Sequence, residues 1–233
     1  MFRYLFLFIT MIAFAEDDGH WGYANNGTES WSENSGTCNR GEAQSPINII
    51  SGAAKHMSKK SELEFHSNVM YRADVIDNGH SIKVTPKRKP YLSIDGEDYT
   101  LLQFHYHGKS EHSVNGKFYD LVVHAVCQNE NTKALVVVAV FYVEGKENKL
   151  LKQILNNVGS TILVLNINLP NQMEEYYHYT GSLTTPPCTE NVQWYILKVP
   201  EEASKQQIIA MRKYYVNNFR PIQELHNRVI DEH

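Results

Sequence analysis

The sequence predicts a mainly β protein with a few short surface helices, and three observations lead to this prediction. The 233 residues, of which 42% are hydrophobic and 21% charged, suffice for one sizeable core or at most two small ones. Apolar and β-branched runs recur along the chain, whereas helical spacing of apolar residues is scarce. No internal repeat or low-complexity linker divides the chain, so we expect a single domain.

The predicted elements are four buried strands and two helices. Each strand run is apolar and is bounded by Gly, Asn, Pro or charged residues. The helical segments show the i, i+3, i+4 spacing of an amphipathic helix. The expected strands are 121–126, 134–143, 161–167 and 192–199, and the expected helices are 150–158 and 201–215.

The N-terminal fifteen residues have the pattern of a secretory signal peptide. Arg3 precedes an apolar run, and Ala13 and Ala15 are small residues at the positions that a signal peptidase reads. The run is shorter than the about 20 apolar residues that a membrane span needs, and no later segment is both that long and free of charge. We therefore expect residues 1–15 to be a signal peptide, residues 16–233 to be the mature domain without a membrane span, and the protein to be exported, periplasmic or extracellular.

The charge balance argues against a nucleic-acid partner. The chain has 22 basic and 26 acidic residues, a net charge of -4, and no stretch gathers five or six Lys and Arg. Its eleven histidines against three cysteines are the unusual feature. Histidine is the commonest metal ligand and titrates near neutral pH, so the histidines are the first candidates for a functional site.

The three cysteines of an exported chain suggest one disulfide and one free thiol, although the sequence does not force the pairing. Cys38 and Cys188 both lie among turn residues, whereas Cys127 follows a Val-rich run and is expected to be a buried thiol. We therefore favour a Cys38–Cys188 disulfide.

Three histidines are predicted to converge on one metal ion. His105 and His107 are two residues apart in an expected strand, so their side chains share a face. If Asn115-Gly116 closes a two-residue hairpin, facing residues have numbers that sum to 231, and His107 faces His124. A His-x-His pair alone would more often be an ordinary polar pair on an exposed strand, but a third histidine in register favours a metal site. Three imidazoles leave one tetrahedral position open, as in catalytic zinc sites.

Several segments match the motifs of one known family. They are Gln44-Ser45-Pro46-Ile47-Asn48-Ile49, Asn78-Gly79-His80, Gln103-Phe104-His105-Tyr106-His107, Ser110-Glu111-His112, Gly181-Ser182-Leu183-Thr184-Thr185-Pro186-Pro187 and Asn218-Phe219-Arg220-Pro221. With these segments the chain resembles the α-class carbonic anhydrases, and the resemblance runs from His20 to Arg228. It implies a twisted, mostly antiparallel central sheet with short peripheral helices, and Zn²⁺ held by His105, His107 and His124. It also implies reversible hydration of carbon dioxide to bicarbonate and a proton by hydroxide on the zinc, and it leaves a homodimer open.

The resemblance implies roles for two threonines and one carboxylate. Thr184 is the hydroxyl that accepts from the nucleophile and donates its own proton to Glu111, and Thr185 lies beside the substrate. The residues alone do not predict the pairing of Thr184 with Glu111. A straight strand would put Glu111 about 13 Å from His107, and a solvated surface acid would be the ordinary interpretation.

The remaining expected site residues bind substrate or move the proton. By resemblance His80 is the proton shuttle, Tyr23 and Asn78 order the intervening water, and Gln103 supports a zinc ligand. Carbon dioxide has no charge or dipole, so its site should be small and apolar. The residues expected to form that apolar wall are Val126, Val137, Leu183, Val192 and Trp194.

One position departs from the family. The family usually has a glutamate two residues before the third zinc histidine, where this chain has Val122, and loss of such a partner typically costs about 10- to 100-fold in metal affinity or activity. Two alternative functions are disfavoured: a non-catalytic binding module on the same fold, by the intact histidines, and a zinc esterase or peptidase, by the missing His-Glu-x-x-His helix.

Overall fold

The computed structural model describes residues 21–233 apart from 24–26, 32–34, 58, 68–70, 166, 168–169 and 171–172. The predicted signal peptide lies outside the described residues. Within this part of the chain, no helix is long and apolar enough to cross a membrane.

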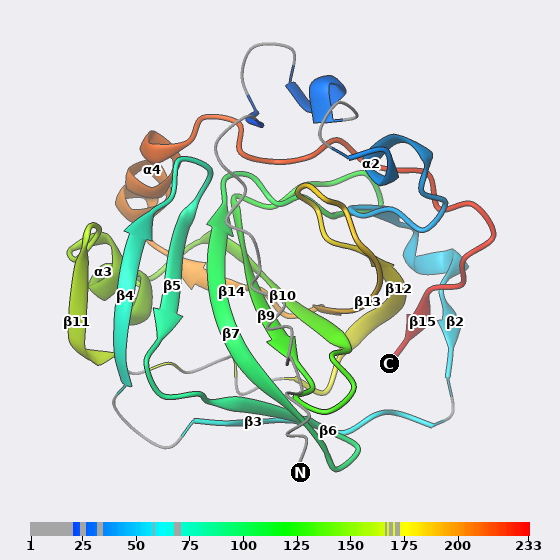
Figure 1. Ribbon diagram of the computed structural model, residues 1–233, viewed down its shortest axis with the longest axis horizontal. Coiled ribbons are helices and arrows are strands. Elements are labelled where there is room, and N and C mark those ends of the chain that lie inside the picture. The colour runs from blue at the N-terminus through cyan, green and yellow to red at the C-terminus, as the bar shows by residue number, and fades with distance from the viewer. Residues whose placement is uncertain are drawn as a thin grey trace, which may run out of the picture.

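A large twisted sheet dominates the molecule (Figure 1). Along its main path the strand order is β11-β4-β5-β7-β9-β10-β13-β12-β15-β2, with β14 beside β10, β6 beside β7 and β3 beside β6. Most pairs are antiparallel, and within the described part of this sheet the parallel ones are β10–β13, β10–β14 and β15–β2. The predicted fold class, a mainly β protein with a twisted and mostly antiparallel central sheet, is therefore confirmed.

The strand bounds follow the chain. They are β1 (Asn48–Ile49), β2 (Lys55–His56), β3 (Leu63–His66), β4 (Tyr71–Asp77), β5 (Ile82–Pro86), β6 (Tyr91–Ile94), β7 (Glu97–His107), β8 (Ser113–Val114), β9 (Leu121–Gln128), β10 (Leu135–Glu144), β11 (Ser160–Leu165), β12 (Tyr176–Ser182), β13 (Glu190–Leu197), β14 (Glu201–Ala203) and β15 (Asp231–Glu232). The four predicted strands correspond to β9, β10, β11 and β13. The helices are α2 (Thr37–Arg40), α3 (Lys149–Leu155) and α4 (Lys205–Tyr214), with 3-10 turns η1 (Gly27–Ser30) and η2 (Ser51–Ala53).

The second predicted helix begins later than expected. Residues Glu201–Ala203 form β14 and pair in parallel with β10, so the prediction of helix from residue 201 is wrong there. Helix α4 starts after Ser204, whose hydroxyl accepts from the N–H of Gln207 while the Gln207 side chain accepts from the N–H of Ser204. This capping box fixes the start of the helix, because it satisfies two of the amides that a helix N-terminus leaves free.

The predicted hairpin is also wrong. Asn115 and Gly116 have φ values of 50° and 77° and close a small turn between Val114 and Lys117, inside the connection of residues 108–120. Strands β7 and β9 pair with His105 opposite His124 and His107 opposite Val122. The register therefore differs by two residues from the prediction. A shift of two keeps every side chain on its face, so the expected convergence survives the wrong turn.

Both faces of the central strands are buried, which explains their continuous apolar runs. Leu121, Val123, Ala125 and Cys127 of β9 point into one core, which helices α3 and α4 cover. The alternate residues point into a second core that contains Val122 and Val126, and His124 shares their face. Cys127 is a buried free thiol, as predicted, and its burial raises its pKa to about 12.

Candidate metal centre and active site

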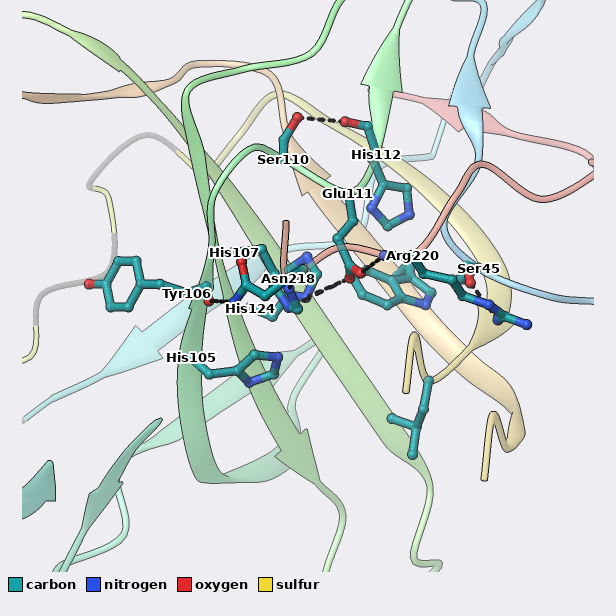
Figure 2. Close-up of polar contacts among 12 residues, drawn as sticks. Ser45, His105, Tyr106, His107, Ser110, Glu111, His112, His124, Asn218 and Arg220 are labelled. Atoms are coloured by element: carbon teal, nitrogen blue, oxygen red, sulfur yellow. Dashed lines mark hydrogen bonds and ion pairs between the residues drawn. The ribbon is translucent and has the colours of Figure 1, made fainter. Parts of the chain in front are cut away.

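Three imidazoles meet on one face of the sheet, where β7 lies beside β9 (Figure 2). The candidate ligand atoms of His105, His107 and His124 all lie within 4.8 Å of one another. His107 and His124 are each only 1% exposed. The three predicted metal ligands are therefore brought together, two from one strand and the third from its neighbour.

Hydrogen bonds orient two of these rings. The Nδ1 atom of His105 donates to Oε1 of Gln103 at 2.9 Å, and Nδ1 of His107 donates to the carbonyl oxygen of Asn218 at 2.5 Å. Both of these oxygens can only accept, so each ring carries its proton on Nδ1 and leaves the Nε2 lone pair available. Nε2 of His107 is buried and has no hydrogen-bond partner among the described residues. An orphaned buried nitrogen beside two further imidazoles fits a bound cation.

Burial also favours the neutral form of His105 and His124, the form that a metal ligand needs. Desolvation, together with the nearby His107, lowers the pKa of His105 and of His124 well below its ordinary value. Neighbouring His112 is buried too, and its pKa falls to about 3. Three imidazole nitrogens that converge on one point are the donor set of a catalytic zinc.

His124, the third histidine, lacks among the described residues a hydrogen-bond acceptor of the kind that orients the rings of His105 and His107. Nδ1 of His124 faces Oε2 of Glu111 at 3.7 Å, but its Nε2 is buried without a hydrogen-bond partner among the described residues. Val122, two residues earlier, is 0% exposed and packs in the apolar core on the same face. No other acceptor in the described chain replaces the carboxylate expected at this position.

Val122→Glu is therefore expected to tighten metal binding. A carboxylate there can accept from Nε2 of His124, which makes the imidazole a better oriented and more basic ligand. We expect zinc release to a chelator to slow by about 10-fold, at the lower end of the range for such partners. Val122→Met, which adds volume without an acceptor, serves as the control. Equal or faster release from Val122→Glu would contradict this expectation, because an unpaired carboxylate in an apolar core is costly.

Glu111 lies beside the histidines and is not the surface acid that the residues alone suggested. Strand β7 ends at His107, and the following connection turns back, so that Oε2 of Glu111 lies 3.6 Å from Nε2 of His107. Glu111 is 0% exposed. Its Oε1 accepts from the backbone N–H of Arg220 at 2.8 Å, and the Thr184 hydroxyl donates to the carboxylate. Burial raises the pKa of Glu111, while His107, Thr184 and Arg220 act in the opposite direction.

The Thr184–Thr185 segment is held between β12 and β13. The N–H of Leu183 donates to the Thr189 carbonyl at 2.9 Å, and the N–H of Cys188 donates to the Thr185 carbonyl at 2.8 Å. A disulfide joins Cys188 to Cys38, which confirms the favoured pairing. Thr184 is buried, with its hydroxyl on Glu111.

The five residues expected to form the apolar wall lie together. Val137 of β10 pairs with Val126 on one side and with Trp194 on the other. The Trp194 ring centroid lies 4.9 Å from that of His124, and its Nε1 donates to the Ser182 carbonyl at 2.9 Å. Leu183 and Val192 pack in the same core. The wall is thus apolar and adjoins the histidines.

His80 and Asn78 lie in the turn between β4 and β5. The Asn78 Oδ1 accepts from the N–H groups of His80 and Ser81, so this exposed side chain closes the turn. The His80 ring stacks on Trp21, with 3.7 Å between the centroids. Tyr23 lies near Glu111, and burial together with that carboxylate raises its pKa.

The sequence predicts no role for Asn218, although its segment is one of the family motifs. Besides holding His107 with its carbonyl, Asn218 accepts at Oδ1 from the N–H of Gly108. Its Nδ2 donates to the carbonyl of Tyr106 (Figure 2). It also donates to the carbonyl of His80 at 3.1 Å. One buried side chain therefore joins the ligand strand to the His80 turn. The stacking of Trp21 on His80 was missed as well, since it has no local sequence signal.

Comparison with known proteins agrees with this geometry. The family model described as eukaryotic-type carbonic anhydrase matches residues 26–233. A carbonic anhydrase of Pectobacterium carotovorum is 35% identical over 97% of this chain and 96% of its own, and one of Neisseria gonorrhoeae is 36% identical over 91% and 88%. The α-carbonic anhydrase of Thermovibrio ammonificans, solved with the inhibitor sulfanilamide, has a TM-score of 0.81 at 36% identity and covers 91% of this chain and 98% of its own. The chain belongs to the α-class carbonic anhydrase family of enzymes.

Proposed function

We propose that this protein catalyses the reversible hydration of carbon dioxide to bicarbonate and a proton at a zinc ion held by His105, His107 and His124. The observation that carries the proposal is the meeting of these three imidazoles within 4.8 Å, with Nδ1 of His105 and of His107 engaged by oxygen acceptors. When bound, zinc would lower the pKa of a coordinated water to about 7, as is established for carbonic anhydrases.

Thr184 and Glu111 orient the nucleophile. The Thr184 hydroxyl has one proton, which it donates to Glu111, so only its lone pairs remain for other partners. It must therefore accept from the attacking oxygen, which directs that oxygen's own lone pair toward the substrate. Oε1 of Glu111 is fixed by the N–H of Arg220, so the carboxylate can hold Thr184 in this role.

The apolar wall receives the substrate. Val126, Val137, Leu183, Val192 and Trp194 offer no group that would hold an ion, which suits an uncharged molecule without a dipole. Thr185 is the proposed polar contact for bicarbonate. A small apolar site beside three metal ligands favours this chemistry over ester or peptide hydrolysis.

His80 is the proposed proton shuttle, and its substitution should slow proton transfer without slowing the hydration of carbon dioxide. His80→Ala is expected to lower kcat by about 10-fold or more, because proton transfer by a positioned histidine contributes at least that much. The ratio kcat/KM should stay within about twofold of the wild-type value, and imidazole buffer should restore part of kcat. His66→Ala, outside the site, is the control. An equal fall in kcat and kcat/KM would show that His80 acts on the hydration step instead.

Zinc content tests the proposal. Elemental analysis of the freshly purified protein should find one zinc per chain. Absence of zinc, with no hydration activity gained when zinc is added, would overturn it.

We also propose that the protein is exported through its N-terminal signal. The Cys38–Cys188 disulfide supports this proposal, since structural disulfides persist mainly in oxidising compartments.

A further inference from the structure

A buried arginine lies behind the candidate active site. Arg220 is 3% exposed, and its guanidinium donates to three fixed oxygens. Nη1 donates to Oε1 of Gln44 at 2.8 Å and to the carbonyl of Ser45 at 2.7 Å, and Nη2 donates to the carbonyl of Cys38 at 2.6 Å. None of these three partners is a carboxylate. A buried charge is costly unless its donors are hydrogen-bonded, and these three oxygens supply the acceptors.

The backbone of the same residue holds the catalytic carboxylate. The N–H of Arg220 donates to Oε1 of Glu111 at 2.8 Å, and the next residue, Pro221, has no N–H to offer in its place. The other carboxylate oxygen, Oε2, faces His107 and His124. Glu111 is thus oriented from one side by a backbone donor.

The guanidinium fixes the position of that donor. Three of its hydrogen bonds tie residue 220 to the 38–45 segment, far away in sequence, and the Trp31 ring lies 5.8 Å from its centre. The planar, five-donor group of arginine suits such a fork of acceptors, which lysine can satisfy only in part. The described segment around residue 220 has no regular secondary structure of its own, so the side chain supplies the anchor that a strand or helix would.

We propose that Arg220 is a positioning residue for the hydration reaction: its guanidinium, anchored on the 38–45 segment, holds the backbone N–H that orients Glu111 and through it Thr184. This inference rests on the proposed function for its effect on turnover, but the anchoring itself is measurable without turnover. Misplacing a reacting group by about 1 Å can lower the reaction rate by about 100-fold, so a less firmly oriented Glu111 should slow the reaction markedly.

The test uses the full chain with three substitutions. Arg220→Met removes the guanidinium, Arg220→Lys keeps the charge with fewer directed bonds, and Arg228→Met is the matched control. The Arg228 guanidinium also bonds three backbone carbonyls, those of Thr180, Glu224 and Leu225, and lies 5.5 Å from the Tyr179 ring. Its hydrogen bonds in the described structure do not reach Glu111.

Hydrogen exchange at the residue 220 amide is the first readout. Arg220→Met should speed this exchange by about 10-fold or more while the amides of β9 keep their protection. The exchange rate in Arg220→Lys should lie between those of the wild type and Arg220→Met. Arg228→Met should leave it unchanged. Unchanged exchange at residue 220 in Arg220→Met would overturn the proposal, and so would an equal loss of protection across β9, which means general destabilisation.

A double-mutant cycle with Glu111→Gln is the second readout. In the wild-type background Arg220→Met should lower kcat/KM by about 10- to 100-fold at unchanged zinc content. In the Glu111→Gln background it should lower kcat/KM by less than about twofold, because Arg220 acts on the reaction through Glu111. Additive losses would overturn the positioning role. A wild-type chain that hydrates no carbon dioxide would instead overturn the proposed function, and the exchange measurement would still decide the anchoring.

Discussion

His107→Ala is expected to abolish both zinc binding and hydration activity. His107 is held by the hydrogen bond from its Nδ1 to the Asn218 carbonyl, and its Nε2 is buried without a hydrogen-bond partner among the described residues. Two remaining imidazoles do not make a catalytic zinc site. The fall in kcat/KM should exceed the about 100-fold that marks the upper end for residues outside the ligand set.

The measurements are zinc per chain and stopped-flow hydration. His66→Ala is the control, because His66 is likewise a strand histidine, and it is half-buried and stacks on Tyr91 away from the site. A His107→Ala protein that still holds one zinc per chain and hydrates carbon dioxide at a rate close to that of the wild type would show that the ligand set is wrong.

Glu111→Gln is expected to lower kcat/KM by about 100-fold with zinc retained, the effect expected when a reacting group is held in the wrong geometry. The new amide can still accept from the Arg220 N–H through its oxygen, but its NH₂ group donates where the carboxylate accepts. The Thr184 hydroxyl would then have to accept from this NH₂ group, and its proton would be directed at the attacking oxygen.

Glu190→Gln controls for the loss of an acid that accepts internal hydrogen bonds. Glu190 accepts from the N–H of Ala43 and from the Gln44 side chain, and its hydrogen bonds in the described structure do not include Thr184. Circular dichroism and zinc analysis would establish that both variants fold and bind metal. Hydration by Glu111→Gln at the wild-type rate would remove Glu111 from the mechanism.

The ligand face could be predicted from sequence because it depends only on strand periodicity. His105 and His107 share a face through their spacing, and His124 joins them in any register that differs by an even number of residues. The register itself could not be predicted, since Asn115-Gly116 is a good turn in either a short or a long connection. The sequence pattern gives the turn type but not the strands that the turn joins.

Glu111, Asn218 and Arg220 show why the rest of the site could not be predicted from the residues alone. Each lies in an irregular segment, and each meets its partners across more than 100 residues of sequence: Arg220 meets Glu111 and Gln44, and Asn218 meets His107. The periodicity of a strand or a helix does not predict such contacts. Only the resemblance to the family paired Glu111 with Thr184, and it assigned no role to Asn218 or Arg220.

Stopped-flow hydration of carbon dioxide before chelation, after complete metal removal and after zinc is returned tests the central claim most directly. We expect the activity of the purified protein to disappear with the metal and to return with one equivalent of zinc per chain, because the three imidazoles hold the ion that acidifies water. Hydration that persists after elemental analysis shows no bound metal, or a zinc-loaded protein that hydrates no faster than buffer, would contradict it.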